Sequence, residues 1–390
     1  MNCFESYIPA RFVFGSGSFG RLSNEKLPGK KALVVISNGK STRKNGYLAR
    51  LEEQLAKAGA EYAVFDKVEP NPLKSTVMEG ARAALEHGCD FVIALGGGSV
   101  MDASKAIAIM ATNEGDLWDH IFQGTGKGKP FTRKALPLVA ISTTAGTGSE
   151  LDAGGVITNA ETNEKTAVFD ESLFPVLSIV DPELTLSVPP EYTAYQGFDA
   201  LFHSVEGYVS AGHNPMSDVY AQAAIENVGR YLARAVKDGG DLEAREHVSF
   251  GNSLSGLVMT TGHCTSEHSL EHAMSAYHQN LPHGAGLIMI SAAYFTHMIR
   301  KGACPERFVK MAKFMGMENA EDPMDFIKAL KKLQRDCGVD GLKMSDYGIS
   351  PDEFEKFAEN AKSSMGFLFE CDRIPLSIED CVSIYTESFR

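Results

Sequence analysis

The chain has 390 residues, of which 44% are hydrophobic and 22% are charged, and 37 basic against 50 acidic residues give it a net charge of −13. This length exceeds that of one ordinary hydrophobic core, so we expect a globular protein of two domains. The acidic balance argues against an extended nucleic-acid-binding surface, which needs clustered Lys and Arg. A membrane-spanning helix needs about 18 or more apolar residues in a row, and the sequence contains no such run.

The seven cysteines are scattered along the chain and form no Cys-x-x-Cys pair. The first residues also lack the basic segment followed by an apolar segment that marks a secretory signal. We therefore expect reduced thiols and a cytoplasmic location, with a small molecule rather than nucleic acid or a membrane as the partner.

Short apolar runs alternate with amphipathic segments in the first half of the chain. The predicted strands are 12–14, 32–36, 62–65, 91–95 and 138–141. Segments 47–58 and 75–87 lie between them and repeat apolar residues at helical spacing. Continuous apolar strands that alternate with helices predict an α/β domain built on a parallel sheet.

A glycine-rich loop follows the strand at 91–95. It reads Gly96-Gly97-Gly98-Ser99 and runs into a segment with an apolar helical stripe. Glycines let the backbone approach a diphosphate closely, and the amides and dipole of a helix N-terminus favour negative charge. An ordinary turn is the alternative, but the position between strand and helix favours phosphate binding. A second small-residue loop, 142–150, follows the next strand and offers hydroxyls and amides to the same ligand, unless it is an ordinary Gly/Ser loop.

The segment after the strand at 32–36 bears on cofactor choice. An NAD-selective dinucleotide fold usually places an acidic residue there, whereas basic or small polar groups accommodate the 2′-phosphate of NADP. Residues 37–44 contain no carboxylate and three cations, Lys40, Arg43 and Lys44. This pattern favours NADP(H), with NAD(H) as the alternative; a solvated basic loop would produce the same pattern.

Two consecutive prolines, Pro189 and Pro190, interrupt the chain near its middle. We place the domain boundary here, with an α/β domain at 1–187 and a helical domain at 188–390. Helical periodicity dominates beyond this point, and no alternating strand pattern appears. The predicted helices are 194–209, 218–236, 243–259, 266–277, 285–299, 305–315, 323–337, 351–362 and 377–389.

Metal-ligand residues are concentrated in the helical half. Asp199 and His203 stand four residues apart, as do His268 and His272, and such pairs share one face of a helix. Five of the eleven histidines fall within 263–283, which is unusual for solvated or core histidines. One carboxylate and three imidazoles suffice to bind a divalent transition metal with a position open for substrate.

The sequence resembles the iron-containing (group III) alcohol dehydrogenases over essentially its whole length. The motifs that carry this resemblance are 14–18, 69–72, 96–105, 143–150, 181–182, 199–208 and 268–284. It implies an N-terminal dinucleotide-binding α/β domain, an all-α C-terminal domain, and a metal and cofactor in the cleft between the domains.

The resemblance also implies residue roles. It assigns the metal, Fe2+ in the first place and Zn2+ as the alternative, to Asp199, His203, His268 and His283, and it places His272 beside nicotinamide and substrate as the proton relay. The implied cofactor contacts are Asn71, Gly97, Gly98, Ser99, Asp102, Thr143, Thr144, Thr147, Ser149 and Lys165. The loop of Asn38, Gly39, Lys40 and Ser41 looks like that of the NADPH-preferring, butanol dehydrogenase-like branch.

One spacing departs from the family pattern. Many members place the last ligand ten residues after the histidine that corresponds to His272, whereas His283 follows here after eleven. An insertion in the turn accounts for this difference, and His278, which lies within the inserted region, is a further candidate for approaching the metal.

The activity that the resemblance implies is reversible hydride transfer between a short primary alcohol and its aldehyde, with a metal and NAD(P)(H). A glycerol or diol dehydrogenase, of propanediol or lactaldehyde type, is the alternative within the same chemistry. A lyase resembling dehydroquinate synthase and a non-catalytic nucleotide-binding protein are alternatives from other classes. We also expect a homo-oligomer, a dimer or larger.

Overall fold

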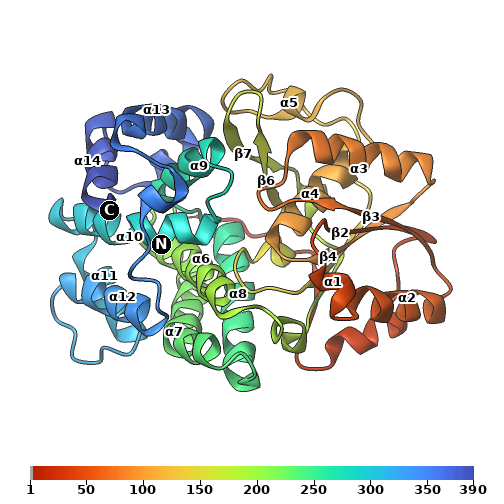
Figure 1. Ribbon diagram of the computed structural model, residues 1–390, viewed down its shortest axis with the longest axis horizontal. Coiled ribbons are helices and arrows are strands. Elements are labelled where there is room, and N and C mark those ends of the chain that lie inside the picture. The colour runs from red at the N-terminus through yellow and green to blue at the C-terminus, as the bar shows by residue number, and fades with distance from the viewer. Residues whose placement is uncertain (1–2) are drawn as a thin grey trace. The chain divides into compact units, whose positions relative to one another are not determined.

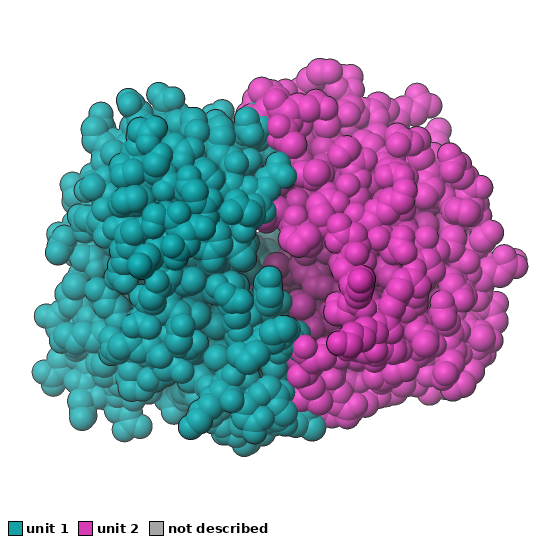
Figure 2. All heavy atoms as spheres, in the orientation of Figure 1, with its two compact units in different colours: residues 1–7, 163–165, 188–390 teal, residues 8–162, 166–187 magenta. Residues whose placement is uncertain are grey.

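The computed structural model describes residues 3–390, which divide into two compact units (Figure 2). The sheet unit comprises Ile8–Thr162 and Thr166–Ser187. The helical unit comprises Val188–Arg390, the short segment Asn163–Lys165 and the N-terminal residues up to Tyr7. Residues 1 and 2 of the predicted N-terminal domain lie outside the described part of the chain.

The sheet unit is built on six parallel strands in the order β1-β8-β5-β4-β2-β3. Their bounds are β1 Arg11–Phe14, β2 Lys31–Ser37, β3 Glu61–Val68, β4 Phe91–Gly96, β5 Leu138–Ser142 and β8 Leu177–Val180. A separate two-stranded sheet pairs β6 (Gly154–Asn159) with β7 (Glu164–Phe169). The predicted parallel α/β sheet is confirmed, but the sequence reading missed β6, β7 and β8.

Helices cover both faces of the parallel sheet (Figure 1). The helices of this unit are α1 Ser41–Lys44, α2 Tyr47–Ala58, α3 Lys74–Glu86, α4 Gly98–Met110 and α5 Leu117–His120. Alternate residues of β2 enter two cores: Leu33 and Val35 pack with α3 and α4, whereas Val34 and Ile36 pack with α2. A strand buried on both faces needs apolar residues at every position, which explains its continuous apolar sequence.

The strand order reverses direction between β2 and β4. From β2 the chain proceeds to β3 at one edge, and from β4 it proceeds through β5 and β8 toward the other edge. In open parallel sheets, ligands bind beyond the carboxyl ends of the strands at such a reversal. The loops that begin at Asn38 and Gly97 leave the carboxyl ends of these two strands.

The helical unit contains no strand between residues 188 and 390, in agreement with the predicted all-α domain. Its helices are α6 Pro190–Val209, α7 Pro215–Lys237, α8 Leu242–Thr261, α9 Ser266–Tyr277, α10 His283–Arg300, α11 Pro305–Phe314, α12 Met324–Asp336, α13 Phe354–Ser364 and α14 Ile378–Ser388. Proline at the first helical position starts α6, α7 and α11, because that position needs no amide donor. Within residues 3–390, no helix has both the length and the apolarity to cross a membrane.

Candidate metal centre and cofactor loops

Three helices of the helical unit bring the predicted metal ligands together. Asp199 and His203 lie one turn apart on α6, His268 lies on α9, and His283 is the first residue of α10. Asp199 Oδ1 is 3.5 Å from His203 Nδ1, 3.5 Å from His268 Nε2 and 3.4 Å from His283 Nε2. One carboxylate oxygen is therefore close to a nitrogen of each predicted ligand histidine.

These three separations match those between neighbouring metal ligands. Asp199, His268 and His283 form one group of mutually close ligand atoms, and His203 belongs to a second group with Cys264 and His268. Oxygen and nitrogen ligands bound tetrahedrally at about 2.0–2.2 Å lie roughly 3.3–3.6 Å from one another. Asp199 Oδ1 and His268 Nε2 are also buried with no hydrogen-bond partner among residues 3–390. Buried polar atoms are rarely left in this state, so the donor set fits a divalent cation.

Close helix packing positions His283 beside α6. A Cβ added at Gly284 would lie 2.1 Å from the backbone oxygen of Tyr195, and one at Gly286 would lie 2.7 Å from Cγ of Glu271. Only glycine allows α10 to begin this close to α6 and α9. The helix starts at His283, two residues earlier than the sequence reading placed it.

The charges of the site reinforce one another. Burial alone would raise the pKa of Asp199, but the charges of His203 and His283 lower it well below its usual value. Burial alone would lower the pKa of His268, but the negative charges of Glu206 and Asp199 raise it to about 10. The pKa of His283 is likewise lowered by burial but raised overall by Glu271 and Asp199. Without a cation, His268 therefore holds a proton at neutral pH, where a bound dication would supply positive charge.

Metal affinity is therefore expected to rise as pH increases toward about 10, the raised pKa of His268, because the cation must displace the proton of this imidazole. The stability of the metal-free chain should change in the opposite direction. The raised pKa of His268 contributes stability that is complete below the ordinary value of 6.5 and is lost as pH rises toward about 10. Metal titrations and thermal unfolding of chelator-treated protein across this range measure both trends. An affinity independent of pH would contradict the protonated state of His268.

Two carboxylates beside the ligands were missed in the sequence. Glu206 on α6 accepts a hydrogen bond from Nδ1 of His268, and Glu271 on α9 accepts one from Nδ1 of His283. Both follow a ligand histidine of their own helix by three residues, so their spacing was a usable signal.

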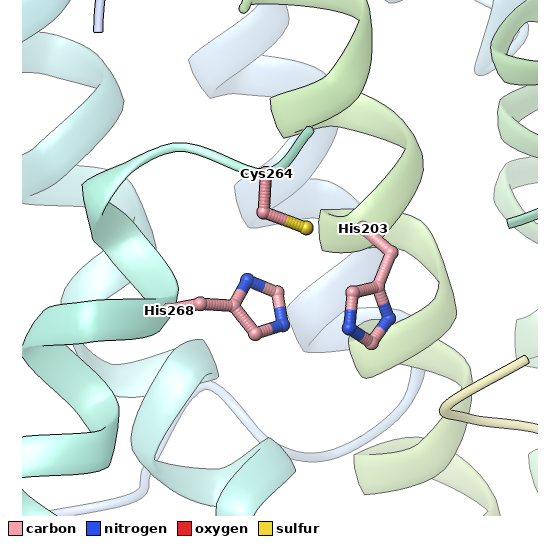
Figure 3. A group of neighbouring side chains, drawn as sticks. All are labelled: His203, Cys264 and His268. Carbon is pink, nitrogen blue, oxygen red and sulfur yellow. The ribbon is translucent and has the colours of Figure 1, made fainter. Parts of the chain in front are cut away.

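Cys264 also lines the metal centre (Figure 3). It lies in the loop before α9, and its Sγ is within 4.8 Å of a ligand nitrogen of both His203 and His268. The two imidazoles are stacked with ring centroids 4.3 Å apart, and the sulfur points toward them in Figure 3. Burial, followed by the charges of Glu206 and Asp199, raises the pKa of the thiol well above its usual value. Cys264 is therefore a neutral thiol at this site.

His272 lies one turn beyond His268 on α9, with its ring centroid 5.1 Å from that of His283. Burial, and then the charges of Lys165 and His283, lower its pKa well below the usual value. The imidazole is thus neutral. The sequence contained no sign of this burial, which bears on the role of proton relay that the resemblance assigned to His272.

His278 has a different environment. It follows the last residue of α9, and its Nε2 lies 3.1 Å from both carboxylate oxygens of Glu353. Among the described residues, several groups of three His, Cys, Asp or Glu residues have ligand atoms close enough together to bind one metal ion. We call these groups metal-competent clusters, and His278 belongs to none of them. The extra residue in the spacing falls in the turn between α9 and α10, which places His278 beside Glu353.

Lys165 is buried in the helical unit, although the other predicted cofactor residues belong to the sheet unit. Its Nζ donates to Ser275 Oγ at 3.0 Å and lies 3.6 Å from the Glu271 carboxylate. Lys165 is therefore bound to two residues of α9, Ser275 and Glu271, and Glu271 is also the hydrogen-bond acceptor of His283.

In the sheet unit, the two predicted phosphate loops pack against each other. Gly97 precedes the first residue of α4, and a Cβ added there would lie 2.6 Å from Thr144 Oγ1. A Cβ at Gly98 would lie 2.2 Å from Cγ2 of Thr147. Because Gly97 and Gly98 have no side chains, the two loops can meet at the start of α4. Ser99 is the second residue of this helix. Thr143 follows β5 directly, and its amide donates to the Gly96 oxygen at 3.0 Å.

Asp102 and Ser149 lie in a buried polar network. Ser149 Oγ donates to Asp102 at 2.8 Å and accepts from Lys105 Nζ at 2.8 Å. The Val156 amide donates to the other oxygen of Asp102 at 2.9 Å. Burial raises the pKa of Asp102 to about 6 although the charge of Lys105 opposes this shift. Both side chains hold the loops together, and their contact with a cofactor stays a prediction.

The predicted selectivity loop is exposed at Asn38, Gly39 and Ser41. Arg43, one of its three cations, pairs with Asp66 on β3 at 2.7 Å. The sequence argument counted no carboxylate here because Asp66 comes from a neighbouring strand rather than from the loop itself. Asn71, by contrast, is buried in a left-handed conformation with φ of 54°.

Comparisons with known proteins show the family of the chain. Residues 9–182 match the model described as iron-containing alcohol dehydrogenase, and residues 193–389 match that of the C-terminal part of the same family. Alcohol dehydrogenase 4 of Saccharomyces cerevisiae is 34% identical over 361 residues, which cover 91% of each chain. The 1,3-propanediol dehydrogenase of Klebsiella pneumoniae is 34% identical over 92% of each chain.

A solved structure resembles the whole chain as well. It is that of an archaeal halo-thermophilic alcohol dehydrogenase from a Red Sea brine pool, with a TM-score of 0.94, 34% identity and 99% coverage of both chains. The chain therefore belongs to the iron-containing alcohol dehydrogenase family and is a metal-dependent oxidoreductase of the alcohol dehydrogenase type.

Proposed function

We propose that the chain transfers hydride reversibly between a short primary alcohol and its aldehyde, with a cation held by Asp199, His203, His268 and His283. The observation that carries this proposal is the position of Asp199 Oδ1, which lies 3.4–3.5 Å from a nitrogen of each histidine. A bound divalent cation supplies Lewis acidity toward the substrate oxygen, and the nicotinamide supplies or accepts the hydride.

The side chains around this oxygen have separate roles in the proposal. Asp199 remains ionised because its pKa is low, so it contributes charge to the cation site. His272 Nδ1 is buried with no hydrogen-bond partner among residues 3–390. We assign this atom to a hydroxyl of substrate or cofactor, which a neutral imidazole can hold and orient through one hydrogen bond. Asp199, His203, His268 and His272 are buried, whereas the side chain of His283 is 21% exposed.

For the nicotinamide we propose binding at the loops after β2, β4 and β5, beside the reversal of strand order. The close packing of Gly97 and Gly98 against Thr144 and Thr147 brings the second loop to the start of α4, where the amides of a helix N-terminus favour a phosphate. Cofactor contacts of Asn71 and Lys165 also belong to the proposal.

NADP(H) is the favoured cofactor in this proposal. The exposed loop with Lys40 and Lys44 supports it, whereas the pairing of Arg43 with Asp66 neutralises one cation and favours NAD(H). Relatives of both kinds exist, such as an NADPH-dependent butanol dehydrogenase of Clostridium saccharobutylicum and a probable NADH-dependent one of Bacillus subtilis.

Fe2+ is the proposed cation, with Zn2+ as the alternative, because carboxylate and imidazole ligands suit both. A diol such as 1,3-propanediol is the alternative substrate, since a relative with that named activity is equally similar.

The free thiols of all seven cysteines support a cytoplasmic location. The homo-oligomer stays a prediction.

An absorbance assay of nicotinamide turnover tests the proposal. Protein is loaded anaerobically with Fe2+ or Zn2+. It is given short aldehydes with NADPH or NADH and, in separate assays, diols with NADP+ or NAD+. We expect metal-dependent aldehyde reduction with a higher kcat/KM for NADPH than for NADH. Turnover with NADH alone would contradict the cofactor assignment, and activity restricted to diols would contradict the simple alcohol.

A further inference from the structure

We infer that Glu206 and Glu271 are positioning residues for the metal centre, each of which fixes one ligand histidine so that its Nε2 faces the cation. This inference rests on the proposed metal site and extends it to the surrounding carboxylates. The pairs are separate in the structure: Glu206 binds His268, and Glu271 binds His283, in both cases at Nδ1.

Glu206 is held in place through both of its oxygens. One accepts from His268, and the other accepts from the amide of Thr265 at 2.8 Å and from its hydroxyl at 3.0 Å. Thr265 is the residue that precedes the first turn of α9, three residues before His268. Glu206 thus ties α6 to the start of the helix that carries the histidine, and its side chain is fully buried.

Glu271 is confined by packing and by charge. It is fully buried, and the missing side chain at Gly286 makes room for it, since a Cβ there would lie 2.7 Å from its Cγ. The oxygen that accepts from His283 also lies 3.6 Å from Lys165 Nζ. Glu271 therefore connects α9 to the first residue of α10.

The direction of both hydrogen bonds determines which nitrogen remains for a metal. A carboxylate accepts the proton of Nδ1, so the neutral imidazole keeps its lone pair on Nε2. In both histidines, Nε2 is the atom that lies 3.4–3.5 Å from Asp199 Oδ1. Two independent pairs thus present the same nitrogen to the same point, which is how carboxylates orient metal-binding histidines.

The test measures metal affinity by chelator competition, and metal-free stability by thermal unfolding, for Glu206→Ala, Glu206→Gln, Glu271→Ala and Glu271→Gln. Outer carboxylates typically contribute about 10- to 100-fold to metal affinity, and we expect losses of this size for the alanine variants. Glutamine keeps an acceptor oxygen, so its losses should be smaller but above twofold. In Co2+-loaded protein, the alanine variants should also shift the visible absorption bands of the ion.

Glu353→Gln is the matched control, because Glu353 also binds a histidine nitrogen, that of His278, outside the metal-competent clusters. Its metal affinity should stay within twofold of the native value. Reduced thermal stability with unchanged metal affinity in the glutamate variants would overturn the inference and leave a purely structural role. If an alanine variant does not fold, the glutamine variant carries the test. A native chain that binds no cation would overturn the metal site itself, and this inference with it.

Discussion

Replacing His268 by Ala is expected to remove the bound cation and to lower kcat/KM by at least about a thousandfold, because Lewis-acid stabilisation contributes several kcal/mol. His268 Nε2 lies 3.5 Å from Asp199 Oδ1, and the side chain is buried. Metal content after gel filtration and steady-state kinetics at saturating cofactor measure the two effects.

His278→Ala is the control for this change. It removes another imidazole of the same segment, but one that binds Glu353 rather than the ligand set. Its metal content should equal that of the native chain. A His268→Ala variant that retains stoichiometric metal and full turnover would rule out the assigned ligand set.

Gly98→Ala is expected to weaken nicotinamide binding by about 10- to 100-fold, since overpacking typically costs about 1–3 kcal/mol. The new Cβ would lie 2.2 Å from Cγ2 of Thr147. Rotation of Thr147 would relieve the clash but break its hydrogen bond from the Ser149 amide, which measures 3.2 Å. The loops would then separate at the start of α4. Fluorescence titration with NADPH and NADH measures the dissociation constants.

Two further variants define the cause of this loss. Gly20→Ala adds the same methyl group where no atom lies within 4 Å, so its cofactor affinity should be unchanged. Thr147→Ser removes Cγ2, so combining it with Gly98→Ala should restore part of the affinity. Native affinity for both cofactors in the single Gly98→Ala variant would mean that the cofactor binds elsewhere.

Part of the candidate metal site could be predicted because its geometry is local. Asp199 and His203 share a helix face at a spacing of four residues, and the histidines that follow are dense enough to indicate a second contribution. The parallel sheet was predictable for a related reason, since strands buried on both faces are continuously apolar. Local periodicity thus sufficed for the fold class and for the pairing of Asp199 with His203, whereas the choice of His283 rather than His272 as a ligand came from the family resemblance.

The remaining features depend on contacts between distant segments. The pairing of Arg43 with Asp66 joins a loop to a neighbouring strand, so counting charges along the loop overlooked it. β8 has only four residues, and a short apolar run does not distinguish strand from helix. The low pKa of His272 results from complete burial beside Lys165, which is distant in sequence.

Titration of metal-free protein with Fe2+ under anaerobic conditions, with aldehyde reduction measured after each addition, tests the central claim most directly. The arrangement of Asp199 with three histidines predicts that turnover rises with added metal and reaches its maximum at one equivalent per chain. Full turnover by the metal-free protein would contradict the assignment of these four residues to a catalytic metal centre.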